Sequence, residues 1–220
     1  MSNNASLNPA DNDSLTGLLR HSFDKFMQDK NGVLPAKVIA YEPGSPPYVQ
    51  VQPLIKMVGT SGETKSRAQL SKIPVVNIGA GGYFLHFNLK AGDMGLIVAC
   101  DRDISLFLQY GAESPPNTYR KKDFADSFFI PIVLYNYTIN AEDSENAVLQ
   151  NLDGSVRLSI FPNKVKITGG LEVDTLKVTG DAEILGNMDI TGRTIINGNL
   201  NTGADITAAG TITPGVPIPP

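Results

Sequence analysis

The stretch that decides the fold is VTGDAEILGNMDITGRTIINGNLNTGADITAAGTITPG, residues 178–215. It contains no aromatic residue, and glycine recurs every five to seven residues between Gly180 and Gly215. Small apolar residues, mostly isoleucine and leucine, lie between the glycines. Because glycine and asparagine tolerate positive φ at turns, each unit is consistent with a short strand followed by a turn. A repeat of this kind predicts a β-helix or a β-prism.

One copy of this repeat cannot bury both faces of such short strands, and it leaves their edges unpaired. Three chains wound about a common axis remove both problems, because each layer then pairs with the layers above and below it. We therefore predict a tapering, intertwined trimeric β-helix over residues 153–215, whose narrow interior admits only small aliphatic side chains. The residues expected in this interior are Ile184, Ile190, Ile195, Ile206 and Ile212.

The distribution of aromatic residues divides the chain. All nine phenylalanines and all seven tyrosines lie at or before Phe161, and we predict a domain boundary in the polar run NAEDSENAVLQNLDG. A conventional core relies on aromatic side chains for burial, and the tail has none. The predicted divisions are a flexible arm at 1–13, a helix at 14–32, an OB-fold-like barrel at 33–138, a linker at 139–152, the β-helix at 153–215 and a proline-rich end at 216–220.

The predicted N-terminal helix has one apolar stripe. Ser14 can cap this helix, and Asn31-Gly32 can end it. The stripe either packs on its own domain or docks on a partner, and the sequence leaves both interpretations open. His21 lies off the stripe and is expected in solvent. The candidate docking residues are Leu15, Leu18, Leu19, Phe23 and Phe26, with Met27 on the same stripe.

From Leu34 to about Thr138 the pattern changes to short segments rich in Val, Ile, Tyr and Phe, bounded by Gly, Pro, Asp or Ser. Five to seven such strands predict a small antiparallel barrel or sandwich, so the chain is mainly β. One of the predicted strands is SLFLQ, residues 105–109. The preceding segment NLKAGDMGLIVACDRDI, residues 88–104, is predicted as a turn, a core strand and a second turn.

Three side chains in this region are expected to have ordinary structural roles. Cys100 is expected to be a small buried side chain. Asp101-Arg102-Asp103 is expected to be a solvated turn with a local ion pair. His86, in an alternating segment, is expected to be a packed or half-exposed strand residue.

Composition excludes several classes of protein. The net charge of −4 provides no basic surface for nucleic acid, and the one basic cluster, Arg120-Lys121-Lys122, is explained more simply as a solvated loop or an interface contact. The single cysteine allows no intrachain disulfide. We expect no signal peptide and no transmembrane helix, since no apolar run approaches the length that spans a bilayer.

The segment IPVVNIGAGGYFLHFNLKAGDMGLIVACDRDISLFL, residues 73–108, resembles the barrel domain of the Gp138-type family of contractile-tail phage spikes. The tail from Leu171 to Thr213 is similar to spike β-helices in general. Four pairs of residues match the landmarks of the family's barrel. Pro74-Val75 matches an early strand, and Gly92-Asp93, Gly95-Leu96 and Arg102-Asp103 match the segment from Leu89 to Ile104.

This resemblance implies an OB-fold barrel, a homotrimer and a virion protein at the centre of the tail baseplate. Such a protein is made in the host cytoplasm, is held by baseplate hub proteins and punctures the host outer membrane when the sheath contracts. A shaft of about eight to ten layers would be on the order of 40 Å long, comparable with a bilayer and its headgroups at about 40–45 Å. The alternative is a trimeric tail fibre or adhesin-type receptor-binding protein.

The chain departs from the family at its end. Many such spikes carry a His-x-His motif that binds iron at the apex, whereas this sequence has no histidine after His86 and no cysteine after Cys100. No metal or other cofactor is therefore expected. The prolines of TITPGVPIPP cannot continue a strand ladder, and we expect a separate spike-tip protein to dock there. The candidate tip-binding residues are Thr211, Ile212, Pro214, Val216 and Ile218.

Other classes of function fit the sequence less well. Hexapeptide acyltransferases need more coils and a catalytic histidine, and the repeat contains none. A cell-wall hydrolase needs paired carboxylates in a cleft, and neither Glu113 nor Glu145 lies in a supporting motif. An OB-fold that binds single-stranded nucleic acid needs a basic groove with exposed aromatic residues. The chain is therefore predicted to be neither an enzyme nor a nucleic-acid-binding protein.

Overall fold

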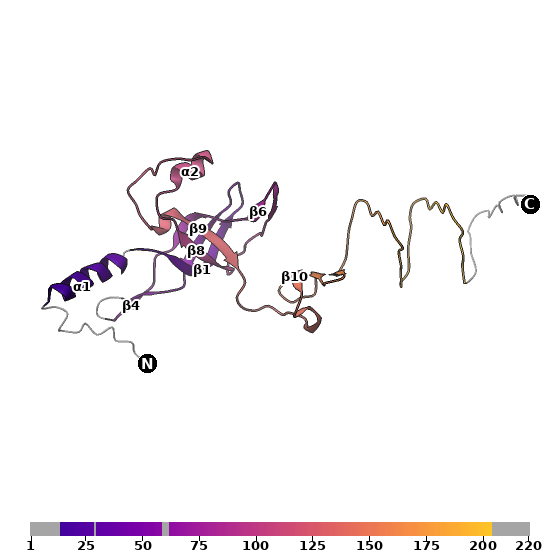
Figure 1. The fold of residues 1–220 in the computed structure, drawn as a ribbon, viewed down its shortest axis with the longest axis horizontal. Helices are drawn as coiled ribbons and strands as arrows, with labels where there is room; N and C mark the ends of the chain where they lie inside the picture. Colours follow the sequence, from indigo (N-terminus) through magenta and orange to yellow (C-terminus); the bar gives the residue numbers. More distant parts are fainter. Residues whose placement is uncertain (1–13, 29, 59–61, 204–220) are drawn as a thin grey trace, which may run out of the picture. The chain divides into compact units, whose positions relative to one another are not determined.

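The computed structural model describes residues 14–28, 30–58 and 62–203 (Figure 1). The chain divides into two compact units, with the division between Gly170 and Leu171. The helices and strands all lie in the first unit: α1 (Leu15–Gln28), β1 (Val33–Glu42), β2 (Tyr48–Pro53), β3 (Met57–Val58), β4 (Thr64–Lys65), β5 (Leu70–Pro74), β6 (Ile78–Ala80), β7 (Tyr83–Leu85), β8 (Met94–Ala99), α2 (Ser105–Tyr110), η2 (Phe124–Asp126), β9 (Ser127–Ile132), η3 (Ala141–Asp143), β10 (Ala147–Gln150), β11 (Arg157–Ile160) and β12 (Val165–Thr168).

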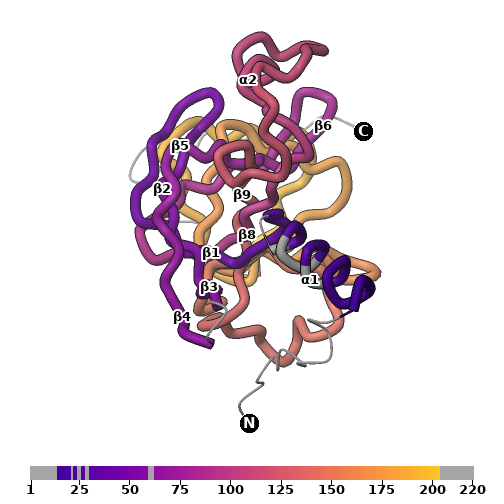
Figure 2. The backbone as a smooth tube through the Cα atoms, turned by 90° about the vertical axis from the view of Figure 1, so that its left-hand side faces the viewer, coloured from indigo at the N-terminus to yellow at the C-terminus, as the bar shows by residue number. Residues whose placement is uncertain are grey.

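A five-stranded sheet in the order β5-β2-β1-β8-β9 forms the main body of the first unit. Each pair of neighbouring strands is antiparallel. The two edges of the sheet meet where Val75 bridges Phe129 and the Val76 amide donates to the Phe129 carbonyl at 2.9 Å. The sheet therefore curls into a half-barrel, as Figure 2 shows, and the predicted OB-fold-like antiparallel barrel is confirmed to this extent.

Alternating apolar residues build the core of the half-barrel. In β2, Val49 and Val51 are buried while their neighbours are partly exposed, as expected for a strand with one face inward. Phe129 of β9 is the largest fully buried side chain. The core consists of Ala36, Val38, Val49, Val51, Ile73, Val75, Leu89, Ile97, Phe124 and Phe129.

The helix α1 forms as predicted, although it ends at Gln28 rather than at Asn31-Gly32. Ser14 caps it, because the Gly17 amide donates to Ser14 Oγ at 3.0 Å and the Leu18 amide to the Ser14 carbonyl at 2.9 Å. None of the other described residues covers the apolar stripe. Its side chains are 51–74% exposed, from Met27 at the low end to Leu15 at the high end.

The segment SLFLQ is a helix, α2, and its prediction as a strand is wrong. The Ser105 amide donates to Asp103 Oδ1 at 2.8 Å, which satisfies a donor at the start of the helix. At the other end Gly111 has φ 63°, a left-handed conformation that favours glycine. These two local signals outweigh the alternation of apolar residues, and none of the residues in α2 is buried.

Residues 140–168, which we call the meander, form a separate three-stranded antiparallel sheet in the order β10-β11-β12. The predicted linker 139–152 therefore includes the η3 turn and the strand β10. Its strand pattern extends over only Ala147–Gln150 within a polar run, which is too short for periodicity to identify. The remaining two strands lie in the segment predicted as the first part of the β-helix.

In the second unit the described residues, 171–203, form neither helix nor strand. The chain bends at Gly180, Gly186, Gly192, Gly198 and Gly203, so the predicted turn positions agree with the structure, and Figure 1 draws this segment as open turns. Its large apolar side chains are 45–92% exposed, and these include the expected interior residues Ile184, Ile190 and Ile195. The trimeric β-helix stays a prediction, since one chain alone is described.

Several predicted positions lie outside the described residues. They are the arm at 1–13, the proline-rich end at 216–220, the interior residues Ile206 and Ile212, and the tip-binding residues Thr211, Pro214, Val216 and Ile218.

Candidate functional site

The residues that carry the family resemblance form the frame of the half-barrel. Gly92 has φ 102°, a conformation that favours glycine, and it forms a tight turn before β8. Asp93 closes this turn by accepting from the Lys90 amide at 2.7 Å. The turn is also tied to β1, because the Gly92 amide donates to the Val38 carbonyl at 2.9 Å and the Val38 amide to the Asp93 carbonyl at 2.8 Å.

Gly95 has a steric role in the same frame. A Cβ atom at this position would lie 2.1 Å from Phe129 Cζ and 2.7 Å from the Ile130 carbonyl oxygen. Only glycine therefore lets the buried Phe129 ring lie across β8. This side chain fills the centre of the core, so Gly95 determines how the two adjacent strands pack.

An ion-pair cluster of Arg120 with the buried Asp103 and Asp126, here called the arginine cluster, joins the long loop after β8 to the half-barrel. Arg120 Nη2 lies 3.2 Å from Asp103 Oδ2, and Arg120 Nε lies 2.8 Å from Asp126 Oδ2. Thr118 Oγ1 donates to Asp103 Oδ2 at 2.6 Å. Both carboxylates are buried, so the expectation of a solvated turn is wrong for Asp103. Arg120 is expected on a solvated loop or at an interface contact, and its side chain is 43% exposed, while its guanidinium also binds the two buried carboxylates.

The hydrogen bonds from Ser105 and Thr118 lower the pKa of Asp103 to about 2, with a smaller contribution from the Arg120 charge. Asp103 is therefore ionised at neutral pH although it is buried. Cys100 is partly rather than fully buried, and burial together with the nearby Asp126 raises the pKa of its thiol. A thiol of this kind is held in its protonated, less nucleophilic form.

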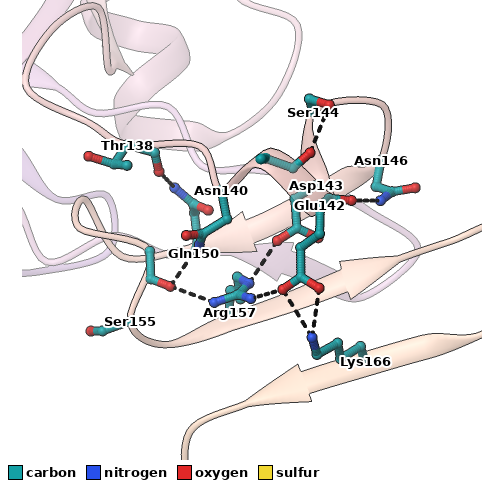
Figure 3. A network of polar contacts seen from close by, with 12 residues as sticks. Thr138, Asn140, Glu142, Asp143, Ser144, Asn146, Gln150, Ser155, Arg157 and Lys166 are labelled. Atoms are coloured by element: carbon teal, nitrogen blue, oxygen red, sulfur yellow. Dashed lines mark hydrogen bonds and ion pairs between the residues drawn. The ribbon is translucent and has the colours of Figure 1, made fainter.

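The polar face of the meander is stabilised within one chain (Figure 3). Arg157 pairs with the buried Asp143, at 2.7 Å between Nε and Oδ2, and also with Glu142. Lys166 pairs with Glu142 at 2.8 Å. Hydrogen bonds from Lys166 and Arg157 lower the pKa of Glu142. Every charged group on this face thus has a partner in the same chain.

The opposite face of the meander is apolar. The register pairs Leu149 with Leu158 and Leu158 with Ile167, so their side chains lie in one row. A second row contains Ala147, Ile160 and Val165. Four of these side chains, Leu149, Ile160, Val165 and Ile167, are 48–62% exposed. An open hollow of about 390 Å³ lies over Leu149, Val156, Leu158 and Ile167.

Other apolar groups in the first unit are exposed as well. The β6–β7 hairpin exposes Ile78, Tyr83, Phe84 and Leu85, and Phe87 follows it. His86 is also exposed, and with Pro46, Pro47 and Phe84 it lines a hollow of about 670 Å³. Together with the uncovered α1 stripe, these groups exceed the scattered apolar residues of an ordinary soluble monomer.

One comparison with known proteins matches nearly the whole half-barrel. Residues 34–132 match the family model of the phage protein Gp138 N-terminal domain. No curated protein matches the chain. The Gp138-like domain begins one residue after the start of β1 and ends at the last residue of β9, so it coincides with the curled sheet. This agreement supports a phage structural protein and a component of the virion.

The predicted docking stripe and the predicted shaft lie outside the Gp138-like domain in the sequence. The α1 stripe precedes it in the chain, and the meander and the tail follow it. Among the described residues no group of three or more His, Cys, Asp or Glu side chains is arranged to hold a metal ion. In the same part of the chain, no helix is long and apolar enough to cross a membrane.

Sequence reasoning missed the arginine cluster and the ion pairs of the meander. Arg120 lies 17 residues from Asp103 along the chain, and Lys166 lies 24 residues from Glu142, so no local spacing connects them. The available signal was indirect. A charged residue in a strand pattern, such as Arg157 among Val156 and Leu158, predicts an inward-facing partner on another element.

Proposed function

We propose that this chain is the central spike of a phage contractile-tail baseplate, that it acts as a homotrimer, and that it punctures the host outer membrane without catalysis. The proposal rests on one combined observation. A Gp138-like domain is followed by a glycine-spaced tail without aromatic residues, whose apolar side chains remain exposed in the single chain.

Each part of the chain has a mechanical role in this proposal. The α1 stripe docks on baseplate hub proteins, and the Gp138-like domain forms a rigid base whose strands and arginine cluster resist deformation. Three tails wind into a shaft, so that every backbone group in the layers is paired and the shaft transmits the force of sheath contraction. A separate tip protein covers the shaft end at residues 211–218.

The low charge near the end of the chain is consistent with entry into a membrane. After Arg193 the only charged residue is Asp205. Few charges lower the free-energy cost of contact with lipid. Crowding around a three-fold axis accounts for the same pattern, because like charges from three chains repel one another. The charge pattern therefore supports a shaft with a narrow axis, and the membrane step needs a direct test.

The test is the position of the chain in particles before and after contraction. We would label contractile phage particles with an antibody against the Gp138-like domain and image them with extended and contracted sheaths. A central spike is labelled at the baseplate centre and, after contraction, at the emerging end of the tube. Label on peripheral fibres, together with purified chain that blocks adsorption to host cells, would instead establish the receptor-binding alternative.

A further inference from the structure

We propose that the apolar face of the meander is the surface by which copies of this chain first associate, and that it sets the register of the tail. The inference rests on the proposed homotrimer and adds which surface initiates it. The occupant of the surface is a second copy of the same chain. The residues of this face are Ala147, Leu149, Leu158, Ile160, Val165 and Ile167.

The meander needs a cover that the described part of its own chain does not provide. Its three strands have only four residues each, and a sheet of this size requires packing on one face to persist. The polar face receives this packing from η3, through Asp143 on Arg157. On the other face the side chains are about half exposed, and the hollow over Leu158 and Ile167 is open.

The charge distribution favours a second copy as the cover. All four charged groups of the meander network, Glu142, Asp143, Arg157 and Lys166, lie on the polar face and pair within the chain. The apolar face carries no charge that would select an acidic or basic partner. A flat aliphatic surface matches its own copies, and closed symmetry lets each copy cover the next.

Continuity along the chain also favours a second copy. The strand β12 ends at Thr168, and the repeat that needs other chains for its core begins at Leu171. When copies associate through the meander, their tails therefore begin at the same level along the common axis. Because a one-residue slip would invert the two faces of every strand, a common start fixes the register of all later layers.

The order of association follows from what is already formed in one chain. The meander has paired strands and a fixed polar face, so its apolar face is present before a partner arrives. Residues 171–203 form no strand in the single chain and must be ordered layer by layer on binding. A preformed surface loses less conformational entropy on association than a segment that folds on binding.

The experiment compares full-length variants by light scattering over a range of protein concentrations. Ile167→Asp places a charge in the meander face, and Ile190→Asp places the same charge in the tail. Ile167→Val is the conservative control. We expect Ile167→Asp to raise the concentration for half-maximal trimer by more than about tenfold, and by more than Ile190→Asp raises it. Ile167→Val should leave this concentration close to that of the wild type. An Ile190→Asp effect as large as that of Ile167→Asp contradicts the meander as the first surface of association.

Near-UV circular dichroism shows whether each variant is folded, since every aromatic residue lies at or before Phe161. A native spectrum with lost trimer for Ile167→Asp supports the inference. Trimeric Ile167→Asp beside monomeric Ile190→Asp overturns it and leaves the proposed function intact. A monomeric wild type overturns both.

A second measurement does not depend on the variants folding. Wild-type chains are refolded, and hydrogen exchange is sampled as trimers accumulate. We expect the amides of β10–β12 to gain protection beyond that of the monomer when oligomers first appear, before the amides of residues 171–203 gain any. Protection that appears first in the tail overturns the inference.

Discussion

At the scale of single residues, the segment that resembles the phage family has structural roles: its residues place the backbone and side chains where the half-barrel needs them. Gly95 makes room for Phe129, Gly92 makes the turn before β8, and Asp103 holds the start of α2 and the guanidinium of Arg120. None of the three faces a cleft that holds a reacting group. Their substitution should therefore change stability and leave docking surfaces in place.

Replacement of Gly95 by alanine should destabilise the half-barrel by about 1–3 kcal/mol, because the added methyl group overlaps the ring of Phe129. The measurement is urea unfolding followed by near-UV circular dichroism. Gly170→Ala is the matched control, since no atom lies within 4 Å of its added methyl group. Equal unfolding midpoints for the two variants would contradict the packing described for Phe129.

Asp103 should make stability depend on pH in the acid range. Its pKa is about 2 in the folded protein against an ordinary value of 3.8, so its ionised form stabilises the fold above pH 4. This contribution is lost as pH falls through the folded value. Asp103→Asn should therefore be less stable than the wild type at pH 7, and the difference should shrink toward pH 2. Thermal unfolding at a series of pH values measures this difference in stability. Asp101→Asn, at an exposed position, is the control, and its stability should follow that of the wild type at every pH.

At the scale of elements, strands with clear alternation and a helix with a cap could be predicted, and elements determined by distant partners could not. The stripe and cap of α1 and the alternation of β2 are local, and both elements form as expected. The segment 105–109 alternates like a strand but becomes α2, because Asp103 and Gly111 favour a helix at its two ends. The strand β10 depends on pairing with β11, which a polar four-residue pattern does not reveal.

The ion pairs of the meander should differ greatly in strength. Arg157→Met leaves the buried carboxylate of Asp143 without its counterion, and we expect a loss of about 3–5 kcal/mol in the local stability of β10–β12. Lys166→Ala removes a partly exposed ion pair and should cost at most about 1 kcal/mol. Hydrogen exchange at the amides of the three strands provides the comparison. Similar exchange rates in the two variants would show that the buried and the exposed ion pair contribute equally to the stability of the strands.

The α1 stripe should be unimportant for the stability of the isolated chain and necessary for its incorporation into particles. Leu18→Ser combined with Phe23→Ser removes two side chains that are more than half exposed. The free energy of unfolding should therefore change by no more than about 0.5 kcal/mol. Particles assembled with this variant should lack the chain. Arg20→Ala, which alters the same helix off the stripe, should assemble normally, and failure of both variants would remove the stripe as the specific docking surface.

At the scale of the whole molecule, the two units differ in what one chain can form alone. The first has a buried core, whereas the described part of the second has none and keeps its large apolar side chains in solvent. The position of the turns could be predicted from the glycines, because turn conformation is local. The core of the tail could not be tested in one chain, since the predicted interior is built from several.

The full chain should have a mass in solution three times its 23.5 kDa, measured by light scattering. A chain ending at Thr138 lacks both the meander and the tail and should be a monomer with the near-UV spectrum of the half-barrel. A monomeric full chain, or a trimeric truncated one, would contradict assembly through the meander and the tail.

The exposed tail also limits how the protein can be made. Exposed isoleucine and leucine side chains can pack against other copies of the tail or aggregate with unrelated proteins. Assembly and aggregation compete from the moment the tail leaves the ribosome. Ribosomes that follow one another on a single messenger RNA release identical chains close together, which raises their local concentration far above the cellular average. The yield of soluble protein should therefore depend on how densely ribosomes load that messenger, and not only on the total amount of chain produced.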